Sequence, residues 1–473
     1  MPARTTRAAA RQRVIQAFMA SLERIIPEDE SKPLKGSKFL DWELQAQALK
    51  QAVVPTLLEE RAALEDNALV EAKEPGNCPH CGSSRVYLEK ETTRTELISP
   101  DGSAEIEKQH CRCRQCGGSF PHRAGTKGSL PAEVPLTPLA AKRLARESAV
   151  QPFAGAAKAM KEDWSLETLD GKQVQRWSEA LGETLVAQRD AELQAYREGR
   201  RPEGPANGPQ LLVLGVDGGR WQGREKDEET QSRWREEKVL TATTFLPGNG
   251  KEGDEEKKPE PLVTTVLATA CDAVEFGKMA RVEAERRGLR QALIVIGMGD
   301  GGNWIDPLFD REFRLEARII DWCHANEHLW DCAKAIHGPQ TPQTSSLAEY
   351  LEALLWDGRV EEVIPKLVEL SRQLGEPLKD DGPQHPRRVL SQNVGYFTKH
   401  KEHMRYPEYR AKGWPIGSGI TEAGVKQFNK RVKGTEQFWG EPGVEAILAL
   451  RGHWVSQDER WDRYWNSRPA YVK

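Results

Sequence analysis

Residues 211–217 read Leu211-Leu212-Val213-Leu214-Gly215-Val216-Asp217, a short continuous apolar run that ends in a carboxylate. Such a run is typical of a central strand that is buried on both faces of a sheet. A second run, Ala292 to Ile296, leads through Gly299 to Asp300 in the same way. We therefore expect two buried strands, each with an aspartate at its end.

The segments around these two runs predict the rest of a mixed α/β domain. Val239 to Phe245 and Leu262 to Ala270 are rich in β-forming residues, Phe276 to Arg287 and Trp304 to Phe313 have helical character, and Ala317 to Asp321 is another strand. Three strands followed by helix, strand, helix and strand is the order of an RNase H-like fold. A largely helical stretch and a last helix, 421–433, follow it.

Length, charge and hydropathy narrow the class of protein. A chain of 473 residues is too long for one hydrophobic core, so we expect about two to four domains. No apolar run approaches the ~20 residues of a membrane span, and we expect no membrane partner. A net charge of −4 argues against coating nucleic acid by bulk charge but allows a local basic groove. Met1 to Arg13 is interpreted as a basic arm, with an organellar transit peptide as the alternative.

Two Cys-x-x-Cys-Gly motifs, Cys78 to Gly82 and Cys113 to Gly117, predict a metal site. Two intervening residues let both thiolates reach one ion, and the glycine permits the tight turn beneath it. The motifs supply the four soft ligands of a closed structural zinc site, which are Cys78, Cys81, Cys113 and Cys116. Residues 92–106 are expected to form a β-hairpin that turns at Pro100-Asp101-Gly102, so the segment is interpreted as a zinc ribbon.

Other side chains near the motifs are weaker ligand candidates. Cys111 could replace Cys113, although its spacing to Cys116 is less suitable. His80, His110 and His122 are each expected to be surface residues. Clustered cysteines in a chain that begins without a secretory signal favour metal binding in a reducing compartment over disulfides.

Residues 137–197 are rich in Ala, Leu, Glu and Arg and predict further helices. Phe153 to Lys161 and Lys172 to Leu185, separated by a turn at Trp164-Ser165-Leu166, are compatible with a helix-turn-helix. A plain helical linker explains the pattern equally well.

Asp217 and Asp300 are the strongest candidates for catalytic residues. A carboxylate at the edge of an apolar strand is costly unless it is paired or binds a metal. Each is followed by two glycines, which would let a polyanion approach the backbone closely. An aspartate in a tight Asp-Gly turn is the alternative for either residue alone, but their shared position at strand ends favours a catalytic pair.

Glu422, in the first turn of the last helix, is the third candidate. Lys426 and Lys430 follow it at i+4 and i+8 on the same face, and Arg431 and Lys433 extend the basic surface. These four cationic residues are candidates for DNA binding. A solvated helix with i,i+4 ion pairs is the alternative for the lysines.

Four motifs together resemble bacterial insertion-sequence transposases, with the ISKra-type group, related to the Mutator-like superfamily, as the nearest. They are Val216–Gly219, Gly299–Ile305, Ile320–His324 and Pro415–Ala423, and the resemblance spans residues 78–454. It implies that Asp217, Asp300 and Glu422 form a DDE triad. Its D-x-x-H signature matches Asp321 and His324, so we count His324 with the catalytic residues and expect a hydrogen bond at the rim of the site.

The resemblance implies a DNA transposase. Three carboxylates could hold two Mg²⁺ or Mn²⁺ ions, hard cations that would not compete with the zinc of the ribbon. Water would cut the element's end, and the freed 3′-hydroxyl would then attack target DNA. Expected partners are terminal inverted repeats, target DNA and further copies of the chain on paired ends, in the bacterial cytoplasm at the nucleoid. The acidic loop Glu252 to Glu260 and the modest basicity depart from the family's pattern.

The expected organisation is an α/β RNase H-like catalytic core with a helical insertion, preceded by a zinc ribbon and a helical DNA-binding region. Its parts are a basic arm with N-terminal helices (1–70), the ribbon (71–130), the helical region (131–205), the first part of the core (206–338), the insertion (339–413) and the last core helix with a tail (414–473). There are two alternatives. One is a nuclease of the same fold without strand transfer, and the other is a non-enzymatic zinc-ribbon and helix-turn-helix regulator.

Overall fold

The structure, a computed structural model, describes residues 5–71, 76–78, 80–121, 134–164, 169–251, 253–434 and 437–466. The chain divides into two compact units, one formed by residues 1–184 with 460–473 and the other by residues 185–459. The division falls inside helix α5 (Gly171–Arg197). The finer partition into six parts remains a prediction. His122 and the expected turn at Ser165 lie outside the described residues.

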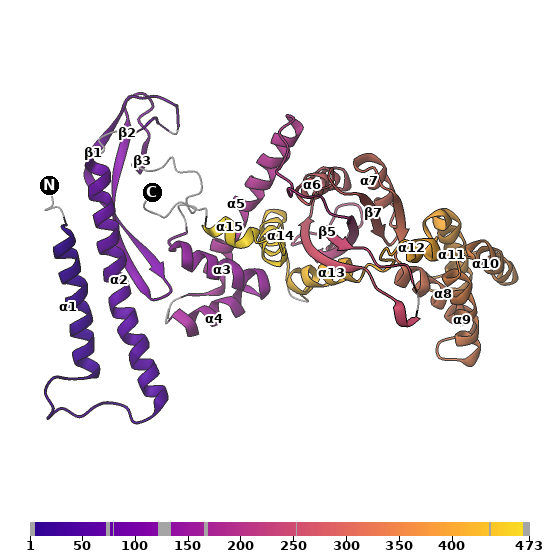
Figure 1. Cartoon of the computed structure of the whole chain (residues 1–473), viewed down its shortest axis with the longest axis horizontal. Helices are drawn as coiled ribbons and strands as arrows, with labels where there is room; N and C mark the ends of the chain where they lie inside the picture. The colour runs from indigo at the N-terminus through magenta and orange to yellow at the C-terminus, as the bar shows by residue number, and fades with distance from the viewer. Residues whose placement is uncertain are drawn as a thin grey trace. The chain divides into compact units, whose positions relative to one another are not determined.

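The first unit begins with two long helices that pack side by side, α1 (Arg7–Ile25) and α2 (Phe39–Glu71) (Figure 1). The hydroxyl of Thr6 caps α1 by accepting a hydrogen bond from the Ala9 N–H. Arg13 on α1 forms an ion pair with Glu60 on α2, with 2.6 Å between Nη2 and Oε2. The N-terminal helices expected within residues 1–70 are therefore present. α1 begins at Arg7, so residues 7–13 of the segment interpreted as a basic arm are helical.

A three-stranded antiparallel sheet follows, with strands β1 (Val86–Ser99), β2 (Gly102–Cys113) and β3 (Ser119–Pro121). The hairpin of β1 and β2 turns at Pro100-Asp101, as predicted. Gly102 has a φ of +123°, and a Cβ there would lie 2.9 Å from Cγ of Pro55 on α2. The turn requires glycine because α2 is packed against it.

Three helices, α3 (Pro138–Val150), α4 (Phe153–Trp164) and α5, complete the unit together with α15 (Arg460–Asn466). The Ser178 and Ser148 hydroxyls join α5 to α3 at 2.6 Å, and Lys142 pairs with Asp462 at 2.6 Å. The two helices predicted on either side of residue 165 are confirmed. The C-terminal helix α15 packs with these N-terminal helices, which the sequence did not indicate.

The second unit is built on a five-stranded sheet with the order β6-β5-β4-β7-β8. Its strands are β4 (Leu211–Gln222), β5 (Trp234–Leu246), β6 (Glu260–Thr269), β7 (Ile294–Gly299) and β8 (Ala317–Ile320). The first three pair antiparallel, whereas β7 and β8 are parallel to β4. All five strands and their order along the chain agree with the prediction.

Alternate residues of β4 face two different layers. Leu212, Leu214 and Val216 pack against α6 (Ala273–Arg286) and α7 (Ile305–Glu312). Leu211 and Val213 face the opposite layer. Both faces of β4 are therefore covered, which explains its unbroken apolar run.

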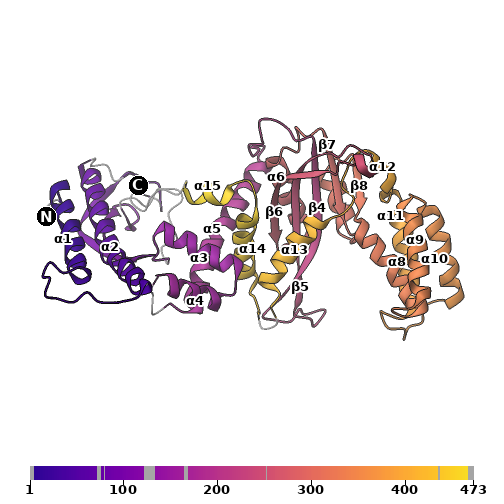
Figure 2. The same cartoon turned by 60° about the horizontal axis from the view of Figure 1, so that its bottom comes forward.

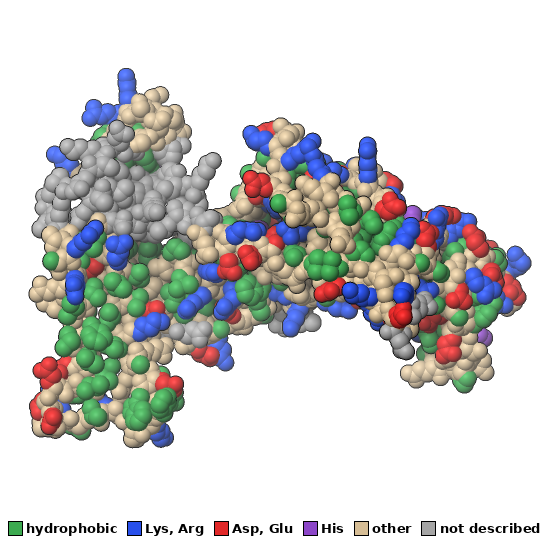
Figure 3. Space-filling view, viewed as in Figure 1, with side chains coloured by type: hydrophobic (Ala, Val, Ile, Leu, Met, Phe, Trp, Pro, Cys, Tyr) green, Lys and Arg blue, Asp and Glu red, His purple; other side chains and the backbone are tan. Residues whose placement is uncertain are grey.

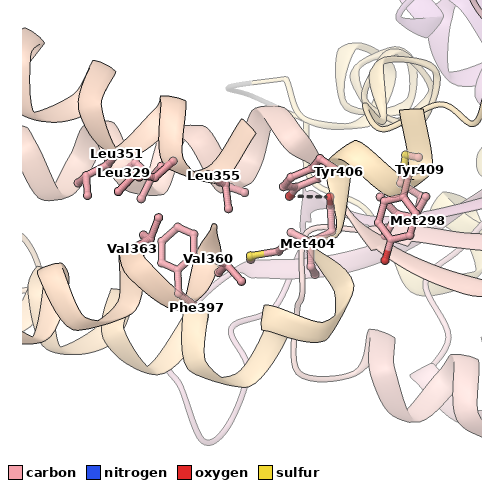
Figure 4. Packing of buried hydrophobic residues seen from close by; sticks show 14 of the residues in the cluster. Met298, Leu329, Leu351, Leu355, Val360, Val363, Phe397, Met404, Tyr406 and Tyr409 are labelled. Carbon is pink, nitrogen blue, oxygen red and sulfur yellow. Dashed lines mark hydrogen bonds between the residues drawn. The ribbon is translucent and has the colours of Figure 1, made fainter. Parts of the chain in front are cut away.

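The opposite layer includes α8 (Trp322–His337), α9 (Pro342–Trp356), α10 (Val360–Leu374), α11 (Pro386–His400) and α12 (Tyr406–Ala411). Figure 4 shows their apolar side chains meeting in one core that extends to Met298 of the sheet. The Tyr406 hydroxyl donates a hydrogen bond to the Ile320 carbonyl at 3.1 Å, which fixes α12 to the end of β8.

Two helices from the end of the chain also cover the sheet. α13 (Gly419–Val432) lies across β4 and β5, and α14 (Glu441–Val455) packs on β6 (Figure 2). Among the described residues, no helix has the length and apolar character that a membrane crossing requires.

Candidate active site and metal centre

Two neighbouring parallel strands bring Asp217 and Asp300 together. β4 and β7 pair from Leu211 opposite Ile294 to Gly215 opposite Met298, and two further residues in that register put Asp217 opposite Asp300. β7 ends one residue before Asp300. The pairing of β4 with β7 therefore brings the two aspartates to neighbouring positions.

The position of Asp217 within its strand differs from the prediction. It is not the last residue of β4, because the strand continues beside β5 to Gln222. What ends at Asp217 is the continuous burial, since the six residues before it are buried and Asp217 is half-buried. Beyond Asp217 buried and more exposed positions alternate, and Trp221 is 1% exposed. The apolar run therefore marks the part of β4 that is buried without interruption rather than the whole strand.

Helix α13 crosses β4 so closely that Gly215 cannot be replaced by another residue without a clash. A Cβ on Gly215 would lie 1.9 Å from Oγ1 of Thr421 and 2.7 Å from Oγ1 of Thr241. The two threonine hydroxyls instead form a buried hydrogen bond of 2.8 Å. Glu422 is the next residue of the helix, and its charge raises the pKa of Asp217. The third predicted carboxylate therefore belongs to the same electrostatic site.

The environment of Asp217 disfavours its ionised form. Burial, followed by the charges of Asp300 and Glu422, raises the pKa of Asp217 to about 6. The Gly218 N–H opposes this shift by donating a hydrogen bond of 2.6 Å to Oδ1. A divalent cation would offset the repulsion between these three carboxylates. Carboxylate oxygens are also the ligands that Mg²⁺ and Mn²⁺ prefer. The donor set therefore fits such an ion.

The three carboxylates are spaced more widely than the ligands of a preformed cluster. Within the described ranges, the cysteines Cys78, Cys81, Cys113 and Cys116 are the group of three or more potential ligands whose ligating atoms all lie within 4.8 Å of one another. The side chains of Asp300 and Glu422 remain about one-third exposed, at 35% and 31%. Both carboxylates are therefore open to solvent.

Asp321 connects the segments that carry the other site residues. Its N–H donates to the last carbonyl of β7 at 3.0 Å. Its fully buried carboxylate accepts hydrogen bonds from the His324 N–H at 2.7 Å, which caps α8, and from the Ser418 N–H ahead of α13. Those segments lead directly to Asp300 and Glu422. The expected hydrogen bond of the D-x-x-H pair is present, and it involves the His324 backbone rather than its ring.

The ring of His324 lies beside Asp300, with 3.9 Å between Nε2 and Asp300 Oδ2. Its Nδ1 lies 3.3 Å from a carboxylate oxygen of Glu327. Burial lowers the pKa of His324, but the charges of Asp300 and Glu327 outweigh burial, so the pKa lies above its usual value. The ring therefore lies beside one of the three predicted carboxylates, and its catalytic role stays a prediction.

Helix α11 supplies two supporting residues that the sequence analysis missed. The Tyr396 hydroxyl donates to the Asp300 carbonyl at 3.0 Å. The buried ring of His400 packs against Gly301, where a Cβ would lie 2.9 Å from Nε2. Both residues lie about a hundred positions after the loop they support, and no local pattern connects them to it.

Packing inside the protein constrains two of the glycines that follow the aspartates. A Cβ on Gly219 would lie 2.2 Å from a carboxylate oxygen of the buried Glu237. Gly301 has a φ of +87° as well as the contact with His400. These contacts explain Gly219 and Gly301 without a ligand, and the close approach of a polyanion stays a prediction.

The basic surface of α13 is carried by lysines alone. Lys426, Lys430 and Lys433 are exposed. Lys426 donates to Glu422 at 2.9 Å and so forms an i,i+4 ion pair, and its contact with DNA stays a prediction. Lys433 Nζ lies 5.8 Å from the centre of the Trp234 ring.

Arg431 is not on this surface, and its prediction as a DNA-binding residue is wrong. It is 1% exposed, and its guanidinium lies 5.1 Å from the centre of the Trp439 ring. Burial lowers the pKa of Arg431 to about 9. Nine positions after Glu422, a residue points to the opposite side of a helix with ~3.6 residues per turn, which is the side packed on the sheet.

Glu237 on β5 is a buried carboxylate that the sequence analysis did not consider. It is 0% exposed, and neither carboxylate oxygen has a hydrogen-bond partner within the described part of the chain. Burial raises the pKa of Glu237 to about 7. The proton is thus held more tightly in the folded chain than in the unfolded one, whose glutamate ionises near pH 4.5.

We predict that Glu237→Gln stabilises the protein at pH 8 and has little effect at pH 4.5. Because the folded pKa is raised, the free energy of unfolding falls as the pH increases from about 4.5 to about 7, by ~3 kcal/mol at most. Thermal midpoints of both proteins at the two pH values measure the effect, expected as a few degrees at pH 8. Glu228→Gln, at an exposed position, is the control. An equal change for Glu237→Gln at both pH values would contradict the prediction.

The four cysteines of the two motifs form the second centre. Sγ of Cys78 lies 3.6 Å from that of Cys116, and Sγ of Cys81 lies 3.6 Å from that of Cys113. Four sulfurs at 2.3 Å from one ion in a tetrahedron would be about 3.8 Å apart. The cluster could therefore bind a metal such as zinc.

Local backbone geometry prepares each motif for a metal. The N–H groups of Gly82 and Gly117 donate to the carbonyls of Cys78 and Cys113 at 2.8 and 3.0 Å, and both glycines have a φ near +70°. Backbone N–H groups lower the pKa of Cys113 to about 6, which favours the thiolate. The glycine turns predicted from the motifs are confirmed.

The alternative ligands lie outside the cluster. Cys111 is fully buried and is not among the four cysteines. His80 is exposed and packs edge-on against Phe120, with 6.1 Å between ring centres. Cys113 rather than Cys111 therefore completes the set, as the spacing predicted.

Comparisons with known proteins found distant structural similarity only. No family model matches the chain, and no curated protein matches it significantly. The chain is similar to a structure described as the Drosophila P element transposase strand transfer complex, with a TM-score of 0.31 and 10% sequence identity. The similarity covers 72% of this chain and 95% of the other.

Proposed function

We propose that this chain is a DNA transposase that uses Asp217, Asp300 and Glu422 to cut the ends of an insertion sequence and to join them to target DNA. The convergence of these three carboxylates carries the proposal. Two come from adjacent parallel strands and one from a helix that crosses the sheet at Gly215. The observed order of strands and helices supports an RNase H-like core, and the quoted motifs support the ISKra-type group.

In this proposal the triad holds two Mg²⁺ or Mn²⁺ ions, which when bound supply Lewis-acid stabilisation of an in-line displacement at phosphorus. The chain orients the ligands itself. The Gly218 and Gly302 N–H groups donate to Oδ1 of Asp217 and of Asp300 at 2.6 and 2.9 Å. The bond to Asp217 opposes the rise of its pKa, and both bonds fix the orientation of a carboxylate for cation binding.

Cationic side chains around the triad are assigned to the DNA. His324, whose ring Nε2 lies 3.9 Å from Asp300, is assigned to a phosphate oxygen near the cut. Lys430 lies near the end of α13 and Lys433 directly follows it. Both are assigned to contacts with the phosphates of the DNA strand beyond the cut. Such contacts position DNA without reading its sequence, so we assign recognition of the terminal repeats to the ribbon and to helices α3–α5.

A strand-transfer assay tests the proposal. Full-length protein, Mg²⁺, a plasmid and pre-cleaved end DNA with a free 3′-hydroxyl should give joined products. The same DNA ending in a dideoxynucleotide should give none, because no 3′-oxygen is available to attack. If ends with a free hydroxyl never join, the transposase proposal fails. Cleavage without joining would then support a nuclease of the same fold.

A further inference from the structure

The three carboxylates of the candidate site lie on backbone segments that are held in different ways. Asp217 lies within β4 and is paired with β5 in the ladder. Glu422 follows Thr421, whose hydroxyl forms a buried hydrogen bond with the sheet. Asp300 lies beyond the end of β7, whose last residue is Gly299, and the pairing of β7 with β8 also ends there. The position of Asp300 therefore depends on contacts other than strand pairing.

Helix α11 supplies such contacts to the backbone of the Asp300 loop. The Tyr396 hydroxyl donates to the Asp300 carbonyl at 3.0 Å. Beyond the end of a strand the ladder no longer provides partners for backbone carbonyls, and here the phenol takes that role. One turn later in α11, the buried ring of His400 packs against Gly301. Two side chains of one helix thus contact two consecutive residues of the loop.

Tyr396 is itself held in place by its aromatic neighbours. Its ring stacks on His328 of α8, with 4.1 Å between ring centres and 30° between the ring planes. The rings of Phe397 and His400 lie 5.4 and 5.1 Å from it. A side chain that is fixed by packing on several sides can position its partner more accurately than a mobile one. The phenol is therefore suited to hold the Asp300 carbonyl in one place.

Helix α8 contacts the carboxylate of the same aspartate. His324 lies one turn before His328, and its ring Nε2 is 3.9 Å from Asp300 Oδ2. α8 packs against α11, and the stacked rings of His328 and Tyr396 lie where the two helices meet. The carbonyl and the carboxylate of Asp300 are therefore contacted by two neighbouring helices of one layer.

The outer surface of this layer carries mixed charges. Figure 3 shows acidic and basic side chains interspersed over α10 and α11. On α10 two of them pair with neighbours, Arg359 with Glu362 at 2.6 Å and Lys366 with Glu369 at 2.9 Å. Binding to the phosphates of DNA is favoured by a surface of one sign, and alternating ion pairs do not form one. The inner face of the layer, which contacts Asp300, therefore carries the inference.

We propose that Tyr396 is a positioning residue for Asp300, and that α8 and α11 thereby set the affinity of the triad for divalent cations. Ligands of such a site must be held within about 0.5 Å of the productive geometry. α11 lies within residues 339–413, the stretch expected to be a helical insertion, so this stretch contributes to the catalytic centre itself. The consequence for cation binding rests on the proposed function, whereas the hold on the loop does not.

Hydrogen exchange of the full chain, without DNA or added cations, tests the hold on the loop. Tyr396→Phe keeps the aromatic ring and removes the hydroxyl. Amides of residues 299–304 should then exchange roughly two- to tenfold faster, which is the effect of losing one net hydrogen bond. Thr398→Val is the matched control on α11, because its exposed hydroxyl donates to the Val394 carbonyl at 2.6 Å. The control should leave exchange in the loop unchanged.

The dependence of DNA cleavage on Mn²⁺ concentration tests the consequence. In Tyr396→Phe the Mn²⁺ concentration for half the maximal rate should rise about tenfold, and excess Mn²⁺ should restore most of the rate. DNA affinity should stay within about twofold of the wild type, because phosphate contacts are untouched. A loss of stability alone would instead lower the rate by the same factor at every Mn²⁺ concentration.

The two measurements separate this inference from the proposed function. Unchanged exchange of residues 299–304 in Tyr396→Phe would overturn the inference even if the wild type transposes DNA. Faster exchange with an unchanged Mn²⁺ dependence would overturn it as well, because the hydroxyl would then be structural only. If the wild type does not cleave DNA, the proposed function fails, and hydrogen exchange alone decides whether Tyr396 positions Asp300.

Discussion

Asp300→Ala is expected to reduce DNA cleavage by at least ~10³-fold, because cation ligands of such a site contribute several kcal/mol to the barrier. Asp300 lies opposite Asp217 in the strand register, and its Oδ1 is held by the Gly302 N–H at 2.9 Å. DNA affinity should change by no more than about threefold, because affinity depends mainly on contacts between cationic residues and phosphates. The variant should therefore bind the element's ends without cutting them.

Cleavage of labelled end DNA and a binding titration at the same salt concentration measure the two effects. Asp331→Ala is a matched control, since it removes a carboxylate that is 59% exposed on α8 and pairs with Lys334. It should keep both activities. Cleavage by Asp300→Ala within tenfold of the wild type would exclude the triad. If neither the wild type nor Asp300→Ala cleaves and both bind DNA with equal affinity, the chain is better described as a DNA-binding regulator.

Cys113→Ser is expected to abolish metal binding by the ribbon and to unfold it. The buried cluster around this site consists of Cys78, Cys111, Cys113 and Phe120, which is too little apolar surface to stabilise the segment alone. A structural zinc ion contributes roughly 10–16 kcal/mol in small zinc domains. Residues 185–459 have their own hydrophobic clusters and should stay folded.

Zinc content by mass spectrometry should fall from about one equivalent per chain to near zero in this variant. Limited proteolysis should then cut within residues 80–121 while the second unit survives. Cys111→Ala is the control, because Cys111 is buried beside the site but is not one of the four cysteines that could ligate the metal. Zinc retained by Cys113→Ser and lost by Cys111→Ala would show that the ligand set is wrong.

The features that the sequence predicted correctly depend on residues close together in the chain. Two cysteines three positions apart reach one ion whatever surrounds them, and the glycine after each pair is needed by the turn itself. The strand around Val213 and the helix that begins near Glu422 were recognisable from runs and periodicity alone. The apolar character of the strands that carry Asp217 and Asp300 indicated that both are buried, whereas their pairing was found only in the structure.

The errors arose where a role depends on a partner far away in the sequence. A side chain at position 219 would clash with Glu237 on the neighbouring strand, and one at position 301 would clash with the ring of His400. Arg431 belongs to a run of basic residues, yet the packing of α13 on the sheet turns it inward. In each case the sequence analysis singled out the residue, but the side chain that it contacts in the folded protein could not be predicted.

The sequence by itself therefore determined the zinc-binding motifs, the order of strands and helices, and the three carboxylates as candidates. Tertiary structure decided that Gly215 lets Thr421 approach the sheet, that Asp321 joins the loops of the site, and which face of α13 remains in solvent. The reason is physical. Turns and helical periodicity follow from contacts within a few residues, whereas the meeting of two side chains depends on how whole layers pack.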